Sequence, residues 1–128
     1  MAAAMSAASI QVLVAEDNDL LREGLVQFLS LCDGIEVTGE AADGQEVVML
    51  CEQLQPHVVL MDLSMPVMDG VEATRIIHER YPYIRIVILT NSFGNSRREA
   101  AFSAGATAYL QKGITVEGIA ETIRAVVM

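Results

Sequence analysis

Polar side chains follow four apolar runs of this sequence, at the points where buried strands would end. These side chains are the carboxylates of Glu16, Asp17 and Asp62, the hydroxyl of Thr90 and the ammonium of Lys112. Because the carboxyl ends of parallel strands meet at one edge of a sheet, we expect these groups to converge there.

Converging carboxylates must either take up protons or bind a cation. Two carboxylates about 4 Å apart repel each other by roughly 4 kcal/mol at an effective dielectric constant of about 20. Oxygen ligands without His or Cys favour a hard ion, and a small number of protein ligands favours Mg²⁺ over Ca²⁺. The spacing of Asp62 and Asp69 lacks the D-x-D-x-D-G pattern of a calcium-binding loop. We therefore expect Mg²⁺, bound beside an incoming phosphoryl group.

Asp62 is the expected nucleophile of this cluster, because it ends a central strand between the other carboxylates. Aspartate carboxylates can form covalent acyl phosphates. Lys112 would offer a positive charge, and Thr90 a hydroxyl donor, to the phosphoryl oxygens. Asp69 has a different expected role, since it precedes Gly70 and a helical pattern, as an N-cap residue does.

Five apolar runs alternate with segments of helical periodicity. The runs predicted as strands are Ile10–Ala15, Ile35–Ala41, His57–Met61, Ile84–Thr90 and Thr107–Gln111. The predicted helices start after Asn18 or Asp19, after Asp43, at about Gly70, near Ser96 and at Val116, and the last three end at about Tyr81, Ala104 and Val127. Alternating strands and helices predict a parallel sheet covered on both faces. The uniformly apolar first, third and fourth strands belong inside, which gives strand order 2-1-3-4-5 in a flavodoxin-like (βα)5 three-layer sandwich.

Length and composition restrict the remaining possibilities. The chain has 128 residues, enough for one domain, which we assign to 10–128 after a flexible tail at 1–9. A net charge of −9 without a basic run argues against direct nucleic-acid binding. We find neither a membrane span nor a signal peptide, and Cys32 and Cys51 fit buried, reduced thiols, so we expect a cytoplasmic protein.

Four motifs give the sequence a family resemblance. They are EDN at 16–18, MDLSMPVMDG at 61–70, LT at 89–90 and GATAYLQK at 105–112. With these motifs, residues 10–127 resemble the receiver domain of two-component response regulators. The sequence of the last motif is most similar to that of NarL/FixJ-type regulators, which usually carry a LuxR-type helix-turn-helix.

The resemblance implies a role for each matching residue. Asp62 would accept phosphate from a sensor histidine kinase, and Mg²⁺ would be held by Asp17, Asp62 and the Ser64 carbonyl. Glu16 would act on the ion through a bound water, Lys112 would pair with the phosphoryl group, and Thr90 and Tyr109 would be switch residues.

Other positions depart from the usual family pattern. Asn91 replaces a smaller residue on the access route to Asp62, and Ser64 and Ser92 would assist hydrolysis only weakly. Gly113 replaces a proline, so we expect a trans Lys112–Gly113 peptide. We also expect a homodimer that forms on phosphorylation through the first and last helices, and a missing DNA-binding output domain.

Three alternatives fit the sequence less well. An Mg²⁺-dependent phosphatase with an aspartate nucleophile commonly has a second Asp two residues on, where this chain has Ser64. A receiver-like interaction module without phosphorylation would not need the acidic set and Lys112. A flavin or nucleotide binder would need a Gly-rich or Ser/Thr-rich phosphate loop after the first strand. The sequence therefore favours a switch without a separate turnover substrate, and not an enzyme.

Overall fold

Strands and helices alternate along the whole described chain. The structure is a computed structural model, and it describes residues 9–91 and 94–128. The strands are β1 (Ile10–Ala15), β2 (Ile35–Ala41), β3 (Val58–Met61), β4 (Arg85–Thr90) and β5 (Ala108–Gln111). The helices are α2 (Asp19–Ser30), α3 (Gly44–Leu54), α4 (Gly70–Arg80), α5 (Asn95–Ala104) and α6 (Val116–Val126).

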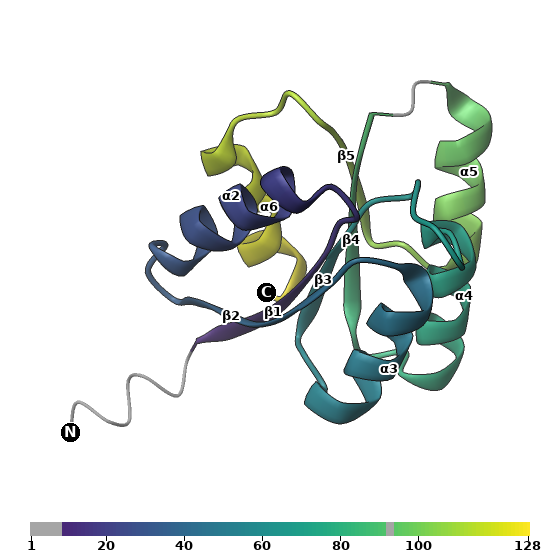
Figure 1. The fold of residues 1–128 in the computed structure, drawn as a ribbon, viewed down its shortest axis with the longest axis horizontal. Coiled ribbons are helices and arrows are strands. Elements are labelled where there is room, and N and C mark those ends of the chain that lie inside the picture. Colours follow the sequence, from purple (N-terminus) through teal and green to yellow (C-terminus); the bar gives the residue numbers. More distant parts are fainter. Residues whose placement is uncertain (1–8, 92–93) are drawn as a thin grey trace.

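The strands form one parallel sheet of order β2-β1-β3-β4-β5. Helices α2 and α6 lie on one side of this sheet, and α3, α4 and α5 lie on the other (Figure 1). This is the predicted flavodoxin-like sandwich, with β2 and β5 at the edges. The order reverses direction between β1 and β3, the kind of point at which α/β proteins build their sites.

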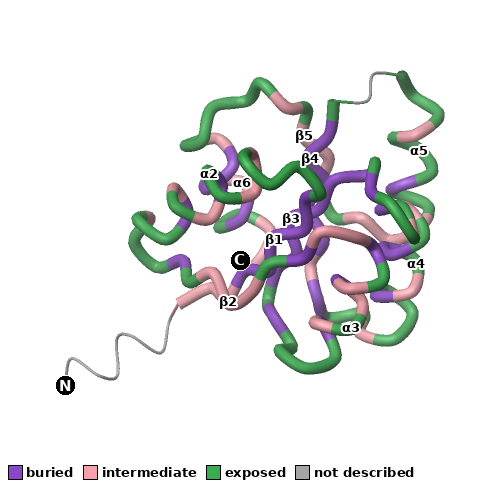
Figure 2. The backbone as a smooth tube through the Cα atoms, viewed as in Figure 1, coloured by how far each residue is buried: buried purple, intermediate pink, exposed green. Residues whose placement is uncertain are grey.

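The core consists of two layers, because successive side chains of a strand point to opposite faces. Val12, Val14, Val58 and Leu60 pack with Leu29 and Ile123 on the α2/α6 side. On the other side, Leu13, Ala15, Val59 and Met61 of the same strands pack with Cys51 of α3 and Ile77 of α4. The central strands are accordingly the most buried part of the fold (Figure 2).

Side-chain caps fix the starts of α2, α3, α4 and α6, and in α6 the Thr115 hydroxyl oxygen accepts the Gly118 amide at 3.0 Å. Asn18 Oδ1 accepts the amide of Leu21 at 2.9 Å, and Asp43 Oδ1 accepts that of Glu46 at 2.8 Å. Asp69 Oδ1 accepts the amide of Glu72 at 2.9 Å. The N-cap role predicted for Asp69 is confirmed, and each cap satisfies an amide that would otherwise lack a helical partner.

Several predicted boundaries are wrong by one residue. The strands begin after His57, Ile84 and Thr107 and not at them. His57 accepts the amide of Gln11 with its side chain, and the Ile84 amide bonds the Tyr81 carbonyl in a turn. The helix ends also differ, since α4 stops at Arg80, α5 begins at Asn95 and α6 stops at Val126. Of the two thiols, Cys51 is buried as predicted, but Cys32 is only partly buried.

Two further expectations concern the ends of the chain and membranes. Residues 1–8 of the expected tail lie outside the described residues. In the part of the chain that the structure describes, no helix is long and apolar enough to cross a bilayer.

Candidate functional site

Glu16, Asp17 and Asp62 meet at the carboxyl ends of β1 and β3. Each offers a carboxylate oxygen, and these oxygens all lie within 4.8 Å of one another. The register accounts for this, because Ala15 pairs with Met61 and the Asp62 amide donates to the Ala15 carbonyl at 3.0 Å. The predicted convergence of the three carboxylates is therefore confirmed.

Lys112 brings its ammonium into the same cluster. Its Nζ lies 3.0 Å from Asp62 Oδ2 and 2.9 Å from Glu16 Oε1. The Lys112 amide donates to the Thr90 carbonyl at 2.8 Å, which ties the end of β5 to the end of β4. The Lys112–Gly113 peptide is trans, as expected, and Gly113 has a φ of 113° that favours glycine. Lys112 therefore bridges two acids before any phosphoryl group is present.

Glu16 is more deeply embedded than the sequence suggested. Its side chain is 3% exposed, and its Oε2 accepts the Asn18 amide at 3.0 Å. Burial raises the pKa of Glu16, and the hydrogen bonds from Lys112 and Asn18 lower it only in part. Burial acts to lower the pKa of Lys112, but its bonds to Glu16 and Asp62 outweigh this effect and raise it. The arrangement favours a charged lysine between two acids.

The loop from Asp62 to Gly70 is held tightly against the cluster. The Ser64 amide donates to Asp62 Oδ1 at 3.3 Å, and the Gly70 amide donates to the Leu63 carbonyl at 2.8 Å. A Cβ atom at Gly70 would overlap the carbonyl oxygen of Asp62, so only glycine permits this close packing. Helix α4 is thereby docked directly behind the proposed nucleophile.

A strained turn lies in the middle of this loop. The Met68 amide donates to the Pro66 carbonyl at 2.7 Å, which makes Val67 the centre of a γ-turn. Val67 has a φ of 71°, a left-handed value that is unfavourable for a β-branched residue. This turn could not be predicted from the sequence, because a glycine or asparagine is the usual signal for a positive φ.

The remaining predicted residues surround the cluster to different degrees. Thr90 is buried at the end of β4, beside the Lys112 amide. Tyr109 is partly buried in β5, and its ring centroid lies 6.3 Å from that of Phe102. Asn91 is exposed next to Thr90, whereas Ser92 lies outside the described residues. His57 and His78 are both exposed, and neither belongs to the described carboxylate cluster.

The donor set fits Mg²⁺. Its candidate ligands are all oxygen atoms, as hard cations require, and Asp17 is exposed so that water can complete the coordination. Lys112 and the ion would share the negative charge of the cluster, which relieves the repulsion between close carboxylates.

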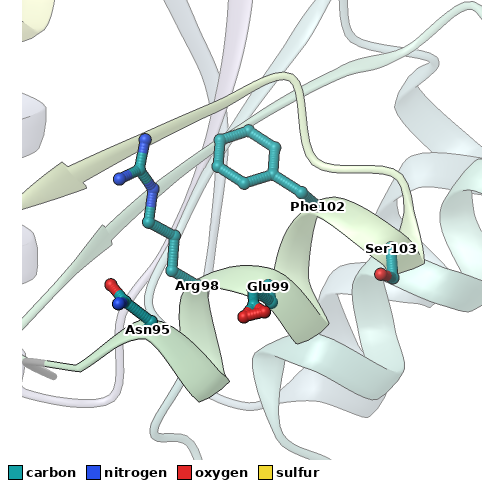
Figure 3. Close-up of a pocket in the computed structure, with 5 residues that line it drawn as sticks. All are labelled: Asn95, Arg98, Glu99, Phe102 and Ser103. Atoms are coloured by element: carbon teal, nitrogen blue, oxygen red, sulfur yellow. The ribbon is translucent and has the colours of Figure 1, made fainter.

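A pocket on the outer surface of α5 is separate from this cluster. It is lined by Asn95, Arg98, Glu99, Phe102 and Ser103. Arg98 and Phe102 project from the same side of the helix, and the Arg98 guanidinium lies 5.5 Å from the centroid of the Phe102 ring (Figure 3). None of the converging acids lines it, so the chemistry belongs to the strand ends and not to this pocket.

Sequence and structure comparisons point to one family. The profile of the response regulator receiver domain matches residues 12–124. Transcriptional regulatory protein LiaR of Bacillus subtilis (strain 168) is 42% identical over 116 residues, which cover 91% of this chain and 55% of LiaR. Response regulator GacA of Pseudomonas protegens is 38% identical over 117 residues, with coverage of 91% and 55%. The chain thus spans about half the length of these curated relatives.

A solved structure gives the same result for the fold. A LuxR-family two-component response regulator from Aurantimonas sp. SI85-9A1 has a TM-score of 0.87 and 32% identity, over 92% of this chain and 84% of that one. The carboxylate cluster of this chain lies within the matched residues 12–124.

Proposed function

The chain belongs to the response regulator receiver family, and on that basis we propose that Asp62 accepts a phosphoryl group from a sensor histidine kinase. Residues 10–128 would form the receiver unit. Receiver domains of two-component systems are in general switches, and we propose that this one has no separate turnover substrate.

The observation that carries this proposal is the arrangement around Asp62. Its carboxylate lies beside two other acids and 3.0 Å from the Lys112 ammonium, at the end of a buried strand. An Asp62 oxygen would attack the phosphorus atom, and the bond from phosphorus to the leaving group would break, with its electron pair going to the leaving group.

The residues around Asp62 would each contribute to this transfer. Bound Mg²⁺ would neutralise charge on the phosphoryl oxygens, and the ligands that would hold it are Asp17, Asp62 and the Ser64 carbonyl, with Glu16 acting through a water. Lys112 would turn from Asp62 Oδ2 to a phosphoryl oxygen. Thr90 would donate its hydroxyl to another phosphoryl oxygen.

Thr90 and Tyr109 are proposed as the switch residues. Thr90 lies in β4 and Tyr109 in the adjacent β5, where Tyr109 pairs with Ile88. A movement of Thr90 toward the phosphoryl group would allow Tyr109 to follow and would change the surface of α5, β5 and α6. To take this equilibrium from 1:99 to 99:1, phosphorylation must favour the active state by about 5.5 kcal/mol.

The output of the switch is proposed to be transcription. LiaR is named a transcriptional regulatory protein, and a structural relative from Staphylococcus aureus is described as a DNA-binding response regulator of the LuxR family. We propose that a DNA-binding domain in the parent protein acts in the cytoplasm, while this chain, with its net charge of −9, binds no nucleic acid itself.

A phosphatase is the second candidate, and the structure gives it less support. The residue two positions after Asp62 is Ser64, which cannot replace the carboxylic acid that such enzymes use on the leaving group. An interaction module without phosphorylation would not explain why the partly buried Lys112 pairs with two buried acids.

The proposed function is tested by intact-protein mass spectrometry after incubation with acetyl phosphate. We expect one added phosphoryl group that requires Mg²⁺ and is absent from Asp62→Asn. Asp69→Asn is the matched control, since asparagine is also a good N-cap and should leave labelling unchanged. Undiminished labelling of Asp62→Asn would refute the assignment.

Asn91 is proposed to limit the loss of the phosphoryl group. Its exposed side chain follows Thr90 at the mouth of the site, where it can hinder an attacking water. Asn91→Ala should lose phosphate up to about tenfold faster, a barrier change of only about 1.4 kcal/mol. The measurement is the decay of the phosphorylated mass, with Asn95→Ala as control. An equal or slower decay in Asn91→Ala would show that Asn91 does not control access.

A further inference from the structure

Glu16 uses both of its carboxylate oxygens within the protein. Oε1 lies 2.9 Å from the Lys112 ammonium, and Oε2 accepts the Asn18 amide at 3.0 Å. Its main chain is equally constrained, because its amide donates to the Ala41 carbonyl at 2.9 Å and its carbonyl accepts from Arg22 at 2.7 Å. Glu16 is therefore a fixed point of the site, while the adjacent Asp17 is exposed.

The Lys112 backbone is held by the bond from its amide to the Thr90 carbonyl, but this bond does not fix the long side chain. Lys112 directly follows β5 at the start of the connection to α6, and the next residue is a glycine at a φ of 113°. Its ammonium is carried on a flexible four-carbon chain and has no fixed orientation of its own. The position of the Lys112 ammonium must therefore be determined by the charge-assisted hydrogen bonds that it makes.

Phosphorylation would affect the bond from Lys112 to Asp62 differently from the bond to Glu16. When an Asp62 oxygen forms a bond to phosphorus and acetate leaves with the electron pair, the Asp62 carboxylate becomes an acyl phosphate. Its charge is then no longer available to hold Lys112 in the original geometry. Glu16 takes no part in that bond change, so its pairing with Lys112 can persist from the free protein to the phosphorylated one.

We infer that Glu16, besides acting on the ion through a water, is a positioning residue that acts through Lys112. Glu16 would hold the Lys112 ammonium beside Asp62. The ammonium would then already be positioned to bind the phosphoryl oxygens when they arrive. This inference rests on the proposed function, and it adds a second role for Glu16 to that function. Asp17 and Asp62 would bind the ion directly, and Glu16 would in addition hold the Lys112 ammonium in place.

The test is a double-mutant cycle at saturating Mg²⁺. Removing a nearby negative charge weakens Mg²⁺ binding whichever role Glu16 has, so the affinity is measured separately by calorimetry and the rate is measured with the ion in excess. We expect Glu16→Gln to lower the maximal rate of labelling by acetyl phosphate about tenfold, the effect of losing one charge-assisted hydrogen bond. Glu52→Gln, an exposed acid on α3, is the charge-matched control and should react like wild type.

The second half of the cycle identifies the route of the effect. If Glu16 acts through Lys112, the double variant Glu16→Gln/Lys112→Ala should be no slower than Lys112→Ala alone. Full recovery of the Glu16→Gln rate at saturating Mg²⁺, or additive losses in the double variant, would overturn the inference. If Glu16→Gln does not fold, Glu16→Asp replaces it in the same cycle.

An NMR measurement separates this inference from the proposed function. The ¹⁵N-ammonium signal of Lys112 should shift and exchange faster with water in Glu16→Gln, and it should be unchanged in Glu52→Gln. An unchanged Lys112 signal in Glu16→Gln would overturn the positioning role even if labelling is slower. Wild type that takes no phosphate at Asp62 would instead refute the proposed function.

Discussion

Lys112 allows two buried carboxylates to lie side by side. Glu16 and Asp62 are 2% and 5% exposed, and each lies within 3.0 Å of the same ammonium. Two charged acids at such a separation would otherwise repel each other strongly away from water. One cation therefore compensates both acids in the free protein, and a phosphoryl group would have to reorganise this pairing.

The two thiols of the chain are expected to differ in reactivity. Burial raises the pKa of Cys51 to about 12, so at pH 8 only about one thiol in ten thousand is ionised. Cys32 is partly buried, and its Sγ lies 3.5 Å from the Phe28 carbonyl. Iodoacetamide at pH 8 should alkylate Cys32 first, and Cys51 only after unfolding. Peptide mass mapping that finds Cys51 alkylated as fast as Cys32 in the folded protein would contradict this.

Cys51 also makes the free energy of unfolding depend on pH. Since the pKa of Cys51 is raised from 9.0 to about 12, the unfolded thiol ionises in a range where the folded one stays neutral. Its contribution to the free energy of unfolding is complete below about pH 9 and is lost as the pH rises toward 12.

The sequence predicted which residues meet, but not how they pair. Asp62, Asp17, Glu16 and Lys112 could be recognised because each follows an apolar run that must end at the same sheet edge. The bond between Glu16 and Lys112 could not, because residues 96 positions apart leave no trace of side-chain direction in a single sequence.

At the scale of elements, the γ-turn at Val67 stores strain beside the site. A non-glycine residue at a left-handed φ costs about 1–2 kcal/mol, and Val67 is 76% exposed, so its side chain recovers little by packing. Val67→Gly should raise the free energy of unfolding by about 1 kcal/mol, after the larger backbone entropy of glycine is deducted.

The measurement is a urea unfolding curve of each variant. Val67→Ala is the matched control, because alanine also shortens the side chain but keeps the cost of the positive φ. It should be clearly less stable than Val67→Gly. If the glycine variant is no more stable than wild type, the turn at Val67 is not strained.

Capping residues and hydrophobic patterns predicted the helices and strands better than they predicted the γ-turn at Val67. Asp43 and Asp69 were recognisable as caps, and the first cap was narrowed to Asn18 or Asp19, because short polar side chains precede helical patterns. Asn18, Asp43 and Asp69 are the residues that accept the helix amides. The starts of β1 and β2 were predicted correctly, but the start of β4 was not, because hydrophobicity marks burial and Ile84 is buried in a turn that precedes β4. Val67 was missed because valine normally indicates extended backbone.

At the scale of the whole molecule, phosphorylation is expected to control self-association. Leu20, Leu21, Leu25 and Val116 line a largely apolar pocket between the starts of α2 and α6, and Leu20 is 79% exposed. The net charge of −9 opposes association of the unmodified protein. We expect a monomer without phosphate and a weak dimer with it.

Sedimentation velocity of both states checks this prediction. Leu20→Ser should prevent the dimer, whereas Met49→Ser, which removes an exposed methionine on α3, should not. The same mass for both phosphorylation states, over a wide concentration range, would reject the coupling.

The most direct test of the central claim is to locate the covalent bond at Asp62. Borohydride reduces an acyl phosphate to an alcohol, so the protein treated with acetyl phosphate and Mg²⁺ and then reduced should carry homoserine in place of Asp62. Tandem mass spectrometry of the peptide that contains residues 61–70 reads this change at a single residue. We predict homoserine at position 62 with Mg²⁺ and none when the ion is chelated. An unmodified Asp62 in protein that has gained a phosphoryl group, or homoserine at another aspartate, would contradict the account.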